Sequence, residues 1–401
     1  MTGSNPTTRH FEFVIIGGGT AGITVASRIL NEAGDSSLAI IEPSDTHYYQ
    51  PLWTLVGAGV VEKEETARPM SSVIPDKATW IKDHASELLP AENAVLTRGG
   101  QRVVYDYLVV APGIQMNWDH IPGLREAIGK NGVCSNFAYQ YADKTWEFLK
   151  NFKEGNAIFT FPATETKCGG APQKIMWLAE HYLQQHRLRD KANVIFATPK
   201  PGIFGVPHYA EALRKLAKER NIITRFRNNL VEIQPDAKTA VFENLDTGER
   251  EALPFEFLHV TPPQSAPDFL RQSPLADEEG WLDVDPYTLQ HKKFSNVFGL
   301  GDASNLPTAK TGAAIRKQAP VLVANLLSLR ENLPFTERYN GYTSCPLITG
   351  YGRLILAEFD YENQPQETFP FDQRKERYSM YLLKRYVLPL LYWHGMLKGR
   401  A

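Results

Sequence analysis

A glycine-rich turn near the N-terminus constrains this chain more than any other feature. Residues 17–22 read GGGTAG and fit the pattern G-x-G-x-x-G. They follow a β-branched and aromatic run, Phe11–Ile16, and precede a helical spacing over Ala21–Leu30. A second apolar run, Ser37–Ile41, ends at Glu42. The order strand, turn, helix, strand and acid is typical of a dinucleotide-binding βαβ unit.

The residue types in this turn suit a pyrophosphate. Glycines let the backbone approach the phosphates, and the N-terminus of the following helix favours negative charge. The acid after the second strand would accept hydrogen bonds from ribose hydroxyls. A plain glycine-rich turn is the alternative, and an acid in register argues against it. We therefore expect cofactor contacts at Gly17, Gly19, Thr20, Ala21, Gly22 and Glu42.

A second unit of the same kind follows about one domain length later. The fold class predicted is α/β, with two interleaved Rossmann-like dinucleotide-binding domains and a C-terminal amphipathic helical segment that associates with a membrane. We expect the first domain at residues 1–113 and 291–340, the second at 114–290, and a C-terminal part at 341–401. The supporting runs are the strands Ala157–Phe161, Asn193–Ala197 and Val297–Gly301, the helices Gln173–Arg187 and Thr311–Leu329, and a hairpin over Tyr342–Tyr361.

Composition excludes several classes of protein. Lys and Arg total 43 against 45 Asp and Glu, a net charge of -2, so a nucleic-acid partner is not expected. Three cysteines are too few for a disulfide scaffold, and their spacing predicts no metal site. Residues 1–13 resemble neither a secretory signal nor a transit peptide, and no uncharged apolar stretch reaches 18 residues.

Two later segments favour a flavin over free nicotinamide. Tyr107–Gly113 (YLVVAPG) and Val297–Asp302 (VFGLGD) resemble further fingerprints of the two-dinucleotide-domain flavoproteins. That resemblance implies FAD, with the acid of the second fingerprint facing the ribityl chain and the next helix N-terminus approaching the flavin ring. The contacts it implies are Gln50, Ala85, Ala111, Gly113, Gly301, Asp302, Lys310, Thr311, Gly312 and Ala313. Ala85 falls in a segment, Trp80–Leu88, that is predicted as one strand-like run.

The second βαβ unit lacks the glycine fingerprint. Its first strand is followed by PATETKCGGAP, which places Cys168 at the carboxyl end of a strand and just before a helix. We expect no nicotinamide there. The helix dipole and Lys167 would lower the pKa of the Cys168 thiol.

At this point the chain resembles the sulfide:quinone oxidoreductases, in the branch that includes the mitochondrial enzyme. The resemblance places that family's redox cysteine pair on Cys168 and Cys345, with the sulfur carrier at Cys345 and the flavin-facing thiol at Cys168. It rests on the stretches NAIFTFPATETKCGGAPQKIMWL, ANVIFATPKPGIFGVPHYAEAL, FLHVTPPQSAPD, NVFGLGDASNLPTAKT, YTSCPLITGYGRLILAEFDY and FPFDQRKERYSMYLLKR.

The implied reaction begins when hydrosulfide attacks a disulfide between these cysteines. A persulfide forms on Cys345, the Cys168 thiolate passes electrons to FAD, and a quinone of the ubiquinone type removes them. Glutathione, sulfite or sulfide would accept the sulfane sulfur. Cys134 lies outside both cysteine motifs and is expected to be structural. The residues leave open whether the chain forms a homo-oligomer.

Other polar residues carry weaker expectations. Glu165 is a candidate proton relay, and a solvated loop carboxylate is the alternative. His47, His84 and His208 are expected to be surface or core histidines rather than catalytic bases.

The last residues, 374–400, combine apolar residues at helical spacing with a basic rim. Pro389 is expected to interrupt or kink the helix, giving two short pieces. Such a segment suits the headgroup region of a membrane, and packing on the protein's own core or at a dimer interface is the alternative. We expect peripheral attachment to a bacterial inner membrane, quinone contacts at Phe359 and Tyr386, and a deletion from Arg374 that abolishes membrane binding but not sulfide-dependent flavin bleaching.

Three other functions are weighed against this one. An NADH:quinone reductase of the same fold would need the missing second glycine fingerprint. A flavin subunit of a cytochrome-linked sulfide dehydrogenase would be expected to carry a signal peptide and no membrane tail. A redox-sensing flavoprotein without turnover is the non-enzymatic alternative.

Overall fold

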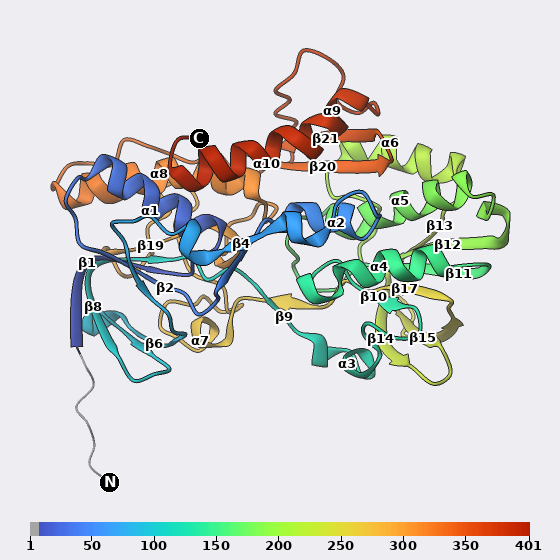
Figure 1. The fold of residues 1–401 in the computed structure, drawn as a ribbon, viewed down its shortest axis with the longest axis horizontal. Helices are drawn as coiled ribbons and strands as arrows, with labels where there is room; N and C mark the ends of the chain where they lie inside the picture. The colour runs from blue at the N-terminus through green and yellow to red at the C-terminus, as the bar shows by residue number, and fades with distance from the viewer. Residues whose placement is uncertain (1–7) are drawn as a thin grey trace, which may run out of the picture.

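The computed structural model describes residues 8–401. Its first unit is built on a seven-stranded sheet in the order β5-β2-β1-β8-β7-β6, with β19 also paired to β8. The pairs β1–β2, β1–β8 and β8–β19 are parallel. Helices α1 and α8 pack against each other beside this sheet (Figure 1). The strands are β1 (Thr8–Ile16), β2 (Leu38–Ile41), β5 (Thr79–Ile81), β6 (Ala85–Leu89), β7 (Ala94–Thr97), β8 (Arg102–Val110) and β19 (Val297–Gly299), and the helices are α1 (Thr20–Glu32) and α8 (Gly312–Arg330).

These elements confirm the predicted strand, turn, helix and strand at the N-terminus. The strands are rich in Val, Ile and aromatic residues because both faces of a parallel sheet are buried. The segment from Trp80 to Leu88 was predicted as one strand-like run. It is two strands, β5 and β6, because the run turns at Lys82–His84 between them.

The second unit is a five-stranded parallel sheet in the order β10-β17-β11-β12-β13, with a separate antiparallel sheet of β14, β15 and β16. The predicted βαβ unit is β11, α5 and β12. The strands are β10 (Val133–Cys134), β11 (Gly155–Thr160), β12 (Ala192–Thr198), β13 (Ile223–Phe226), β14 (Asn228–Gln234), β15 (Thr239–Asn244), β16 (Arg250–Pro254) and β17 (Phe257–His259), and the helices are α4 (Tyr139–Asn151), α5 (Ala171–Gln185) and α6 (Pro207–Glu219).

The chain crosses between the two units twice, where β9 (Gln115–Met116) pairs with β18 (Gln264–Ser265). Figure 1 shows β9 between the two sheets. The predicted hairpin is also present, as β20 (Thr343–Gly350) and β21 (Arg353–Phe359), and it packs on α5. Shorter elements are β3 (Thr46–Tyr48), β4 (Ala67–Pro69), α2 (Trp53–Val56), α3 (Leu124–Ala127) and α7 (Asp268–Arg271).

The C-terminal segment forms one continuous helical rod along the upper edge of the molecule (Figure 1). It starts at α9 (Tyr378–Leu382), widens into a π-helical turn over Leu383–Val387 and continues as α10 (Leu388–Leu390). A second π-helical turn and a 3-10 turn carry it to Lys398. The expectation of two separate pieces at Pro389 is therefore wrong, because helical turns continue on both sides of it. The wide turn before Pro389 relieves the clash between its ring and the carbonyl of the preceding turn, so the helix continues.

Candidate active site

The glycine-rich turn between β1 and α1 is packed too tightly for side chains at two of its positions. A Cβ on Gly22 would lie 1.8 Å from the Gly17 carbonyl oxygen, and one on Gly17 would lie 2.3 Å from that of Ala111. Gly17 also has φ +98°, a conformation that favours glycine. At Gly19 a Cβ would meet no atom within 4 Å, so the outer side of the turn is open.

Glu42 lies beside this turn and is largely buried. Its two oxygens accept hydrogen bonds from the backbone N–H groups of Gly18 and Ser44, each at 2.7 Å. Burial raises the pKa of the carboxyl, against the lowering effect of these hydrogen bonds. Each carboxylate oxygen keeps a lone pair that a ribose hydroxyl can use.

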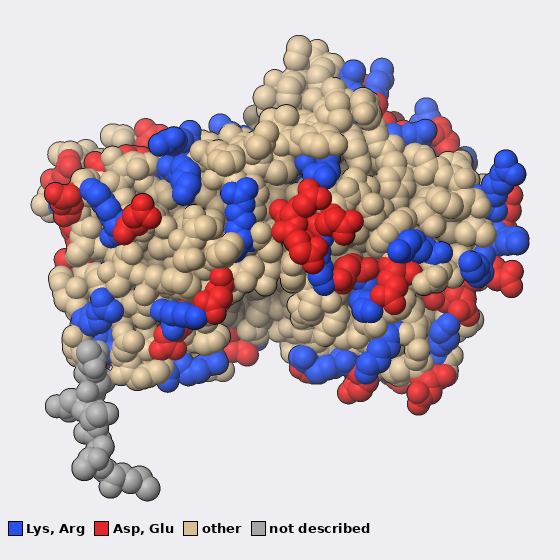
Figure 2. Space-filling view, in the orientation of Figure 1, with Lys and Arg blue, Asp and Glu red and all other residues tan. Residues whose placement is uncertain are grey.

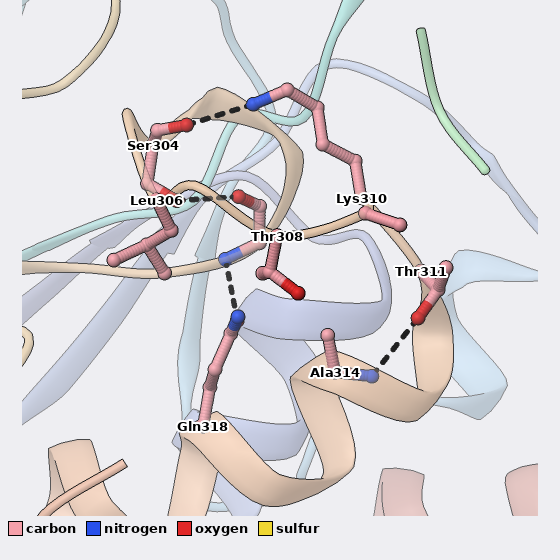
Figure 3. A pocket seen from close by; sticks show the side chains of 9 residues that line it. Ser304, Leu306, Thr308, Lys310, Thr311, Ala314 and Gln318 are labelled. Carbon is pink, nitrogen blue, oxygen red and sulfur yellow. Dashed lines mark hydrogen bonds between the residues drawn. The ribbon is translucent and has the colours of Figure 1, made fainter. Parts of the chain in front are cut away.

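The other predicted cofactor residues lie at the carboxyl ends of β8 and β19 and at the start of α8. Thr311 caps α8 by accepting from the Ala314 N–H at 3.0 Å, and Lys310 Nζ donates to the Ser304 carbonyl at 2.8 Å (Figure 3). Gly301 donates its N–H to Gln318 at 3.0 Å. A Cβ on Gly113 or Gly312 would meet no atom within 4 Å. These three segments and the glycine-rich turn therefore lie around one edge of the first sheet.

This edge fits a dinucleotide such as FAD. It offers an open glycine turn at a helix N-terminus, a buried acid for a ribose, and a second acid, Asp302, after β19. The Asp302 carboxylate has no hydrogen-bond partner within residues 8–401, and burial raises its pKa. Of the two outlying predicted contacts, Ala85 opens β6 opposite Thr97, and the Gln50 side chain accepts from Lys167 Nζ at 2.5 Å.

The structure brings Cys168 and Cys345 together. Their Sγ atoms lie 3.6 Å apart, one on the loop between β11 and α5 and the other on β20. Cys168 has φ +54°, unusual for a residue other than glycine, and its N–H donates to the Lys310 carbonyl at 2.8 Å. The cysteine loop is thereby tied to the segment that opens α8, on the nucleotide side of the first unit.

The two thiols differ in acidity because of their neighbours. A hydrogen bond with Cys345 and the charge and hydrogen bond of Lys174 lower the pKa of Cys168 well below its usual value, although burial opposes them. The same pair contact, together with burial, raises the pKa of Cys345. Lys174 Nζ donates to Cys168 Sγ at 3.1 Å. Cys168 is therefore the thiolate of the pair.

The sequence indicated the wrong lysine for this effect. Lys167 Nζ bonds to the Gln50 side chain and lies over the Trp53 ring, and burial lowers its pKa to about 8. Lys174 was missed. It lies in the first turn of α5, and helical side chains lean toward the N-terminus, so it reaches back to the loop. The position of Lys174 in the first turn of the helix after the cysteine loop was therefore the sequence signal that could have identified it.

The C-terminal helix also contacts the nucleotide turn, which the sequence did not predict. The Tyr392 hydroxyl lies 2.9 Å from the Thr20 hydroxyl and 2.6 Å from His47 Nε2. The other ring nitrogen of His47 lies 2.9 Å from the Gly18 carbonyl. Further along, Ser27 donates to the Leu397 carbonyl at 2.7 Å. A deletion from Arg374 would remove these contacts with α1 as well as the outer face, so it would not test membrane attachment alone.

The two predicted quinone residues lie in different surroundings. Phe359 is buried at the end of β21, with its ring edge-on to Phe204 at 6.0 Å. Tyr386 is 56% exposed on the outer side of the C-terminal helix. Tyr378, Val387 and Leu390 are also more than half exposed, so four large apolar or aromatic side chains of this helix face outward. Figure 2 shows few charged side chains along this edge and mixed charges elsewhere on the same face.

The remaining candidates have ordinary environments. Cys134 is fully buried, and burial raises the pKa of its thiol. Glu165 is a solvated loop carboxylate that pairs with Lys200 at 3.7 Å. His208 lies 3.1 Å from Glu367. Within residues 8–401, no three His, Cys, Asp or Glu side chains are grouped to hold a metal ion.

A mixed seven-stranded sheet, a parallel five-stranded sheet, an open glycine turn and a cysteine pair at the nucleotide edge define a disulfide-type flavoprotein fold. Residues 11–151 match the family described as "Pyridine nucleotide-disulphide oxidoreductase". The mitochondrial sulfide:quinone oxidoreductase of Mus musculus is 51% identical over 97% of this chain and 87% of its own length. The corresponding protein of Dictyostelium discoideum is 49% identical over 97% of this chain and 86% of its own. This chain belongs to the sulfide:quinone oxidoreductase family.

A solved structure agrees on the fold. The sulfide:quinone oxidoreductase of Aquifex aeolicus superposes with a TM-score of 0.84 at 21% identity, over 98% of this chain and 92% of that one. The relatives at 51% and 49% identity confirm the family resemblance seen in the sequence. Among the residues that the structure describes, the helices are too short or too polar to cross a bilayer.

Proposed function

We propose that this chain oxidises sulfide to the sulfane level and passes two electrons to a quinone. The observation that carries this proposal is the contact of Cys168 and Cys345 beside Lys174, at the nucleotide edge of the fold. The names of the relatives at 51% and 49% identity support it, since both are sulfide:quinone oxidoreductases.

FAD fits the nucleotide edge, and when bound it supplies a two-electron acceptor between the cysteines and the quinone. Gly17, Gly19, Thr20, Ala21 and Gly22 would hold its pyrophosphate at the N-terminus of α1. Glu42 would hold a ribose. Asp302, with its unpartnered carboxylate, would face the sugar chain. The contacts expected beyond these are Gln50, Ala85, Ala111, Gly113, Gly301, Lys310, Thr311, Gly312 and Ala313.

The cysteines carry the sulfur chemistry. Hydrosulfide attacks Cys345 of the oxidised pair, a new S–S bond forms there, and the bond between the cysteines breaks. Cys168 leaves as a thiolate, which suits its lowered pKa because a more acidic thiol leaves faster. A nucleophilic acceptor then takes the outer sulfur from Cys345, the pair gives up two electrons, and the disulfide re-forms. Glutathione, sulfite or sulfide are the acceptors we propose.

The loop after β11 argues against an NADH:quinone reductase. A nicotinamide dinucleotide needs an open glycine turn between the first strand and helix of its domain. Here that connection carries Cys168, whose carbonyl accepts from the Ala171 N–H at 2.7 Å, and Leu347 fills the space beside Gly170. The proposed second domain, residues 114–290, is thus a nucleotide-type fold that has taken over sulfur chemistry, while residues 1–113 and 291–340 bind FAD.

Quinone and membrane contacts are proposed for residues 341–401. A quinone is insoluble in water and must be collected from a bilayer, and the exposed side chains of Tyr386, Val387 and Leu390 suit the headgroup region. Arg374 and Lys375 begin a basic rim for anionic lipids. Phe359 and Tyr386 remain our proposed quinone contacts. The mitochondrial relatives favour a mitochondrial membrane over the bacterial inner membrane expected from the sequence.

One experiment tests the central reaction. Anaerobic mixing of the flavin-loaded protein with sulfide should bleach the oxidised-flavin absorbance and produce a long-wavelength charge-transfer band from the Cys168 thiolate. Cys168→Ser should keep its flavin and lose both signals. Bleaching by NADH in place of sulfide would refute the proposal.

A further inference from the structure

The inner face of the C-terminal helix is bonded to the helix that follows the glycine-rich turn. Ser27 and Asn31 of α1 donate to the Leu397 and Lys398 carbonyls at 2.7 and 3.0 Å. A Cβ on Gly399 would lie 2.9 Å from backbone atoms of α1, so the two segments are in direct backbone contact. Figure 1 shows the end of the C-terminal helix beside α1. The C-terminal helix is therefore part of the nucleotide edge.

A row of hydrogen bonds leads from this helix to the centre of the turn, and only one direction of donation satisfies all of them. His47 is buried, and its Nδ1 must donate to the Gly18 carbonyl at 2.9 Å, because a carbonyl only accepts. Burial lowers the pKa of His47 to about 4, so the ring is neutral at pH 7 and its Nε2 accepts. Tyr392 must then donate its one hydrogen to Nε2 at 2.6 Å, and it accepts from the Thr20 hydroxyl at 2.9 Å. The Thr20 hydroxyl has no hydrogen left for a phosphate.

Gly18, at the centre of the turn, is held at both of its peptide groups. Its N–H donates to Glu42 at 2.7 Å, and its carbonyl accepts from His47. The Tyr392 ring packs on Tyr49 with centroids 4.4 Å apart, which holds the hydroxyl in place. Loss of this hydroxyl would leave a buried ring nitrogen without a donor, which costs more than an ordinary hydrogen bond contributes. The position of the turn therefore depends on the docked helix.

We propose that Tyr392 is a positioning residue for FAD: it holds the glycine-rich turn in its binding shape through His47, so docking of the C-terminal helix and binding of FAD favour each other. Such coupling is reciprocal, because the free energy that docking adds to FAD binding equals the free energy that FAD adds to docking. The helix that exposes Tyr386, Val387 and Leu390 on its outer face thus contributes to the cofactor site with its inner face. This inference rests on the proposed binding of FAD at this edge.

The first test removes one oxygen atom, as Tyr392→Phe, and measures the FAD dissociation constant by equilibrium dialysis of the flavin-loaded protein against graded FAD. The constant should rise about tenfold, because His47 Nε2 and the Thr20 hydroxyl lose their partner. Sulfide-dependent bleaching of the protein that retains flavin should keep its rate. Tyr378→Phe is the matched control, since Tyr378 is 64% exposed at the start of the same helix, and it should keep the wild-type constant. A wild-type constant in Tyr392→Phe would overturn the inference.

A double-variant cycle separates positioning from a general loss of packing. Thr20→Val should also weaken FAD binding, because it removes the hydroxyl that donates to Tyr392. The double variant Thr20→Val, Tyr392→Phe should bind FAD no more weakly than Tyr392→Phe alone, because the two hydroxyls act through one bond. Additive losses would refute the inference, since each hydroxyl would then act by itself.

Hydrogen exchange tests the reverse direction of the coupling in the wild type. Removal of FAD should speed exchange of the backbone amides of residues 391–398 about tenfold, whereas the amides of β11 in the second unit should keep their rates. Equal exchange of the C-terminal amides with and without FAD would overturn the inference. The proposed function is judged separately: a flavin-loaded protein that shows this coupling but is not bleached by sulfide would refute that function and leave the role of Tyr392 standing.

Discussion

The amine of Lys174 lies 3.1 Å from the sulfur of Cys168, and no such contact joins it to Cys345. The hydrogen bond with Cys345 and the charge and hydrogen bond of Lys174 together lower the pKa of Cys168, so this thiol is the thiolate of the pair. Lys174→Met should raise the pKa of Cys168, because the positive charge that holds it down is lost. The charge-transfer band should then appear only at higher pH, with turnover at pH 7 at least about tenfold lower. Lys200→Met, on a partly exposed lysine, is the control and should match the wild type.

Two of the three cysteines, Cys168 and Cys345, should be required for sulfide oxidation, and Cys134 should not be. Cys345→Ser should abolish sulfide oxidation, because no disulfide can form for hydrosulfide to attack. Cys134→Ser should keep turnover near the wild-type rate and lose about 1 kcal/mol of stability, because a buried hydroxyl replaces a thiol. Steady-state quinone reduction and thermal melts measure both effects. A large loss of turnover in Cys134→Ser would overturn its structural assignment.

Gly22→Ala should prevent the glycine turn from forming. The added Cβ would lie 1.8 Å from the Gly17 carbonyl oxygen, a backbone atom that cannot move aside cheaply. We expect a loss of about 3 kcal/mol or more in unfolding free energy, together with loss of flavin from the purified protein. Gly202→Ala is the control, since its Cβ would meet no atom within 4 Å. Retention of flavin at the wild-type ratio in Gly22→Ala would contradict this account of the turn.

The double variant Tyr386→Glu, Leu390→Glu should separate membrane binding from sulfide chemistry. Both side chains are more than half exposed, so the fold should tolerate the charges. Vesicle co-sedimentation and reduction of a long-chain quinone should fall several-fold, while sulfide-dependent bleaching in solution stays fast. Leu333→Glu places the same charge on an apolar residue that is 55% exposed after α8. Leu333→Glu should leave vesicle binding and quinone reduction unchanged. Equal losses in both proteins would contradict the assignment of the outer face of the C-terminal helix to the membrane.

His47 should make stability depend on pH. Burial lowers its pKa from 6.5 to about 4 in the folded protein, so between these values only the unfolded chain takes up the proton. Stability should fall as the pH drops from about 6.5 to about 4, by about 3 kcal/mol from this group. In His47→Asn the slope over that range should be shallower. Denaturant unfolding of both proteins between pH 4 and 7 measures the difference, and parallel slopes would exclude His47 as its source.

Local sequence patterns were sufficient to predict most of the fold. The glycine turn, both βαβ units and the hairpin follow from apolar runs and turn residues that act within about ten positions, and the structure confirms them. Pro389 was misjudged because the rule that proline breaks a helix ignores the π-helical turn that accommodates it. The prediction of a single strand from Trp80 to Leu88 was wrong because the apolar residues on both sides of Lys82–His84 gave no sign of the turn between them.

Local sequence patterns predicted less of the candidate active site than of the fold. The pairing of Cys168 with Cys345 came from family resemblance, since spacing along the chain carries no information about two segments that meet only after folding. The whole segment 374–400 was interpreted as membrane-facing, and the inward contacts of Tyr392 with Thr20 and His47 were missed. Amphipathic periodicity indicates that a helix has two faces, but it does not indicate that the inner face lies against the nucleotide turn.

The contact of Cys168 with Cys345 joins segments 177 residues apart in the chain. A covalent bond there closes a loop of that length, worth about 5 kcal/mol of chain entropy in the unfolded state. Each round of sulfide oxidation would therefore open and remake a cross-link between two distant parts of the chain. In the proposed cycle, the oxidised enzyme would carry a covalent bridge between these two segments, and the reduced enzyme would not. Reductant alone, with no substrate present, should lower its melting temperature.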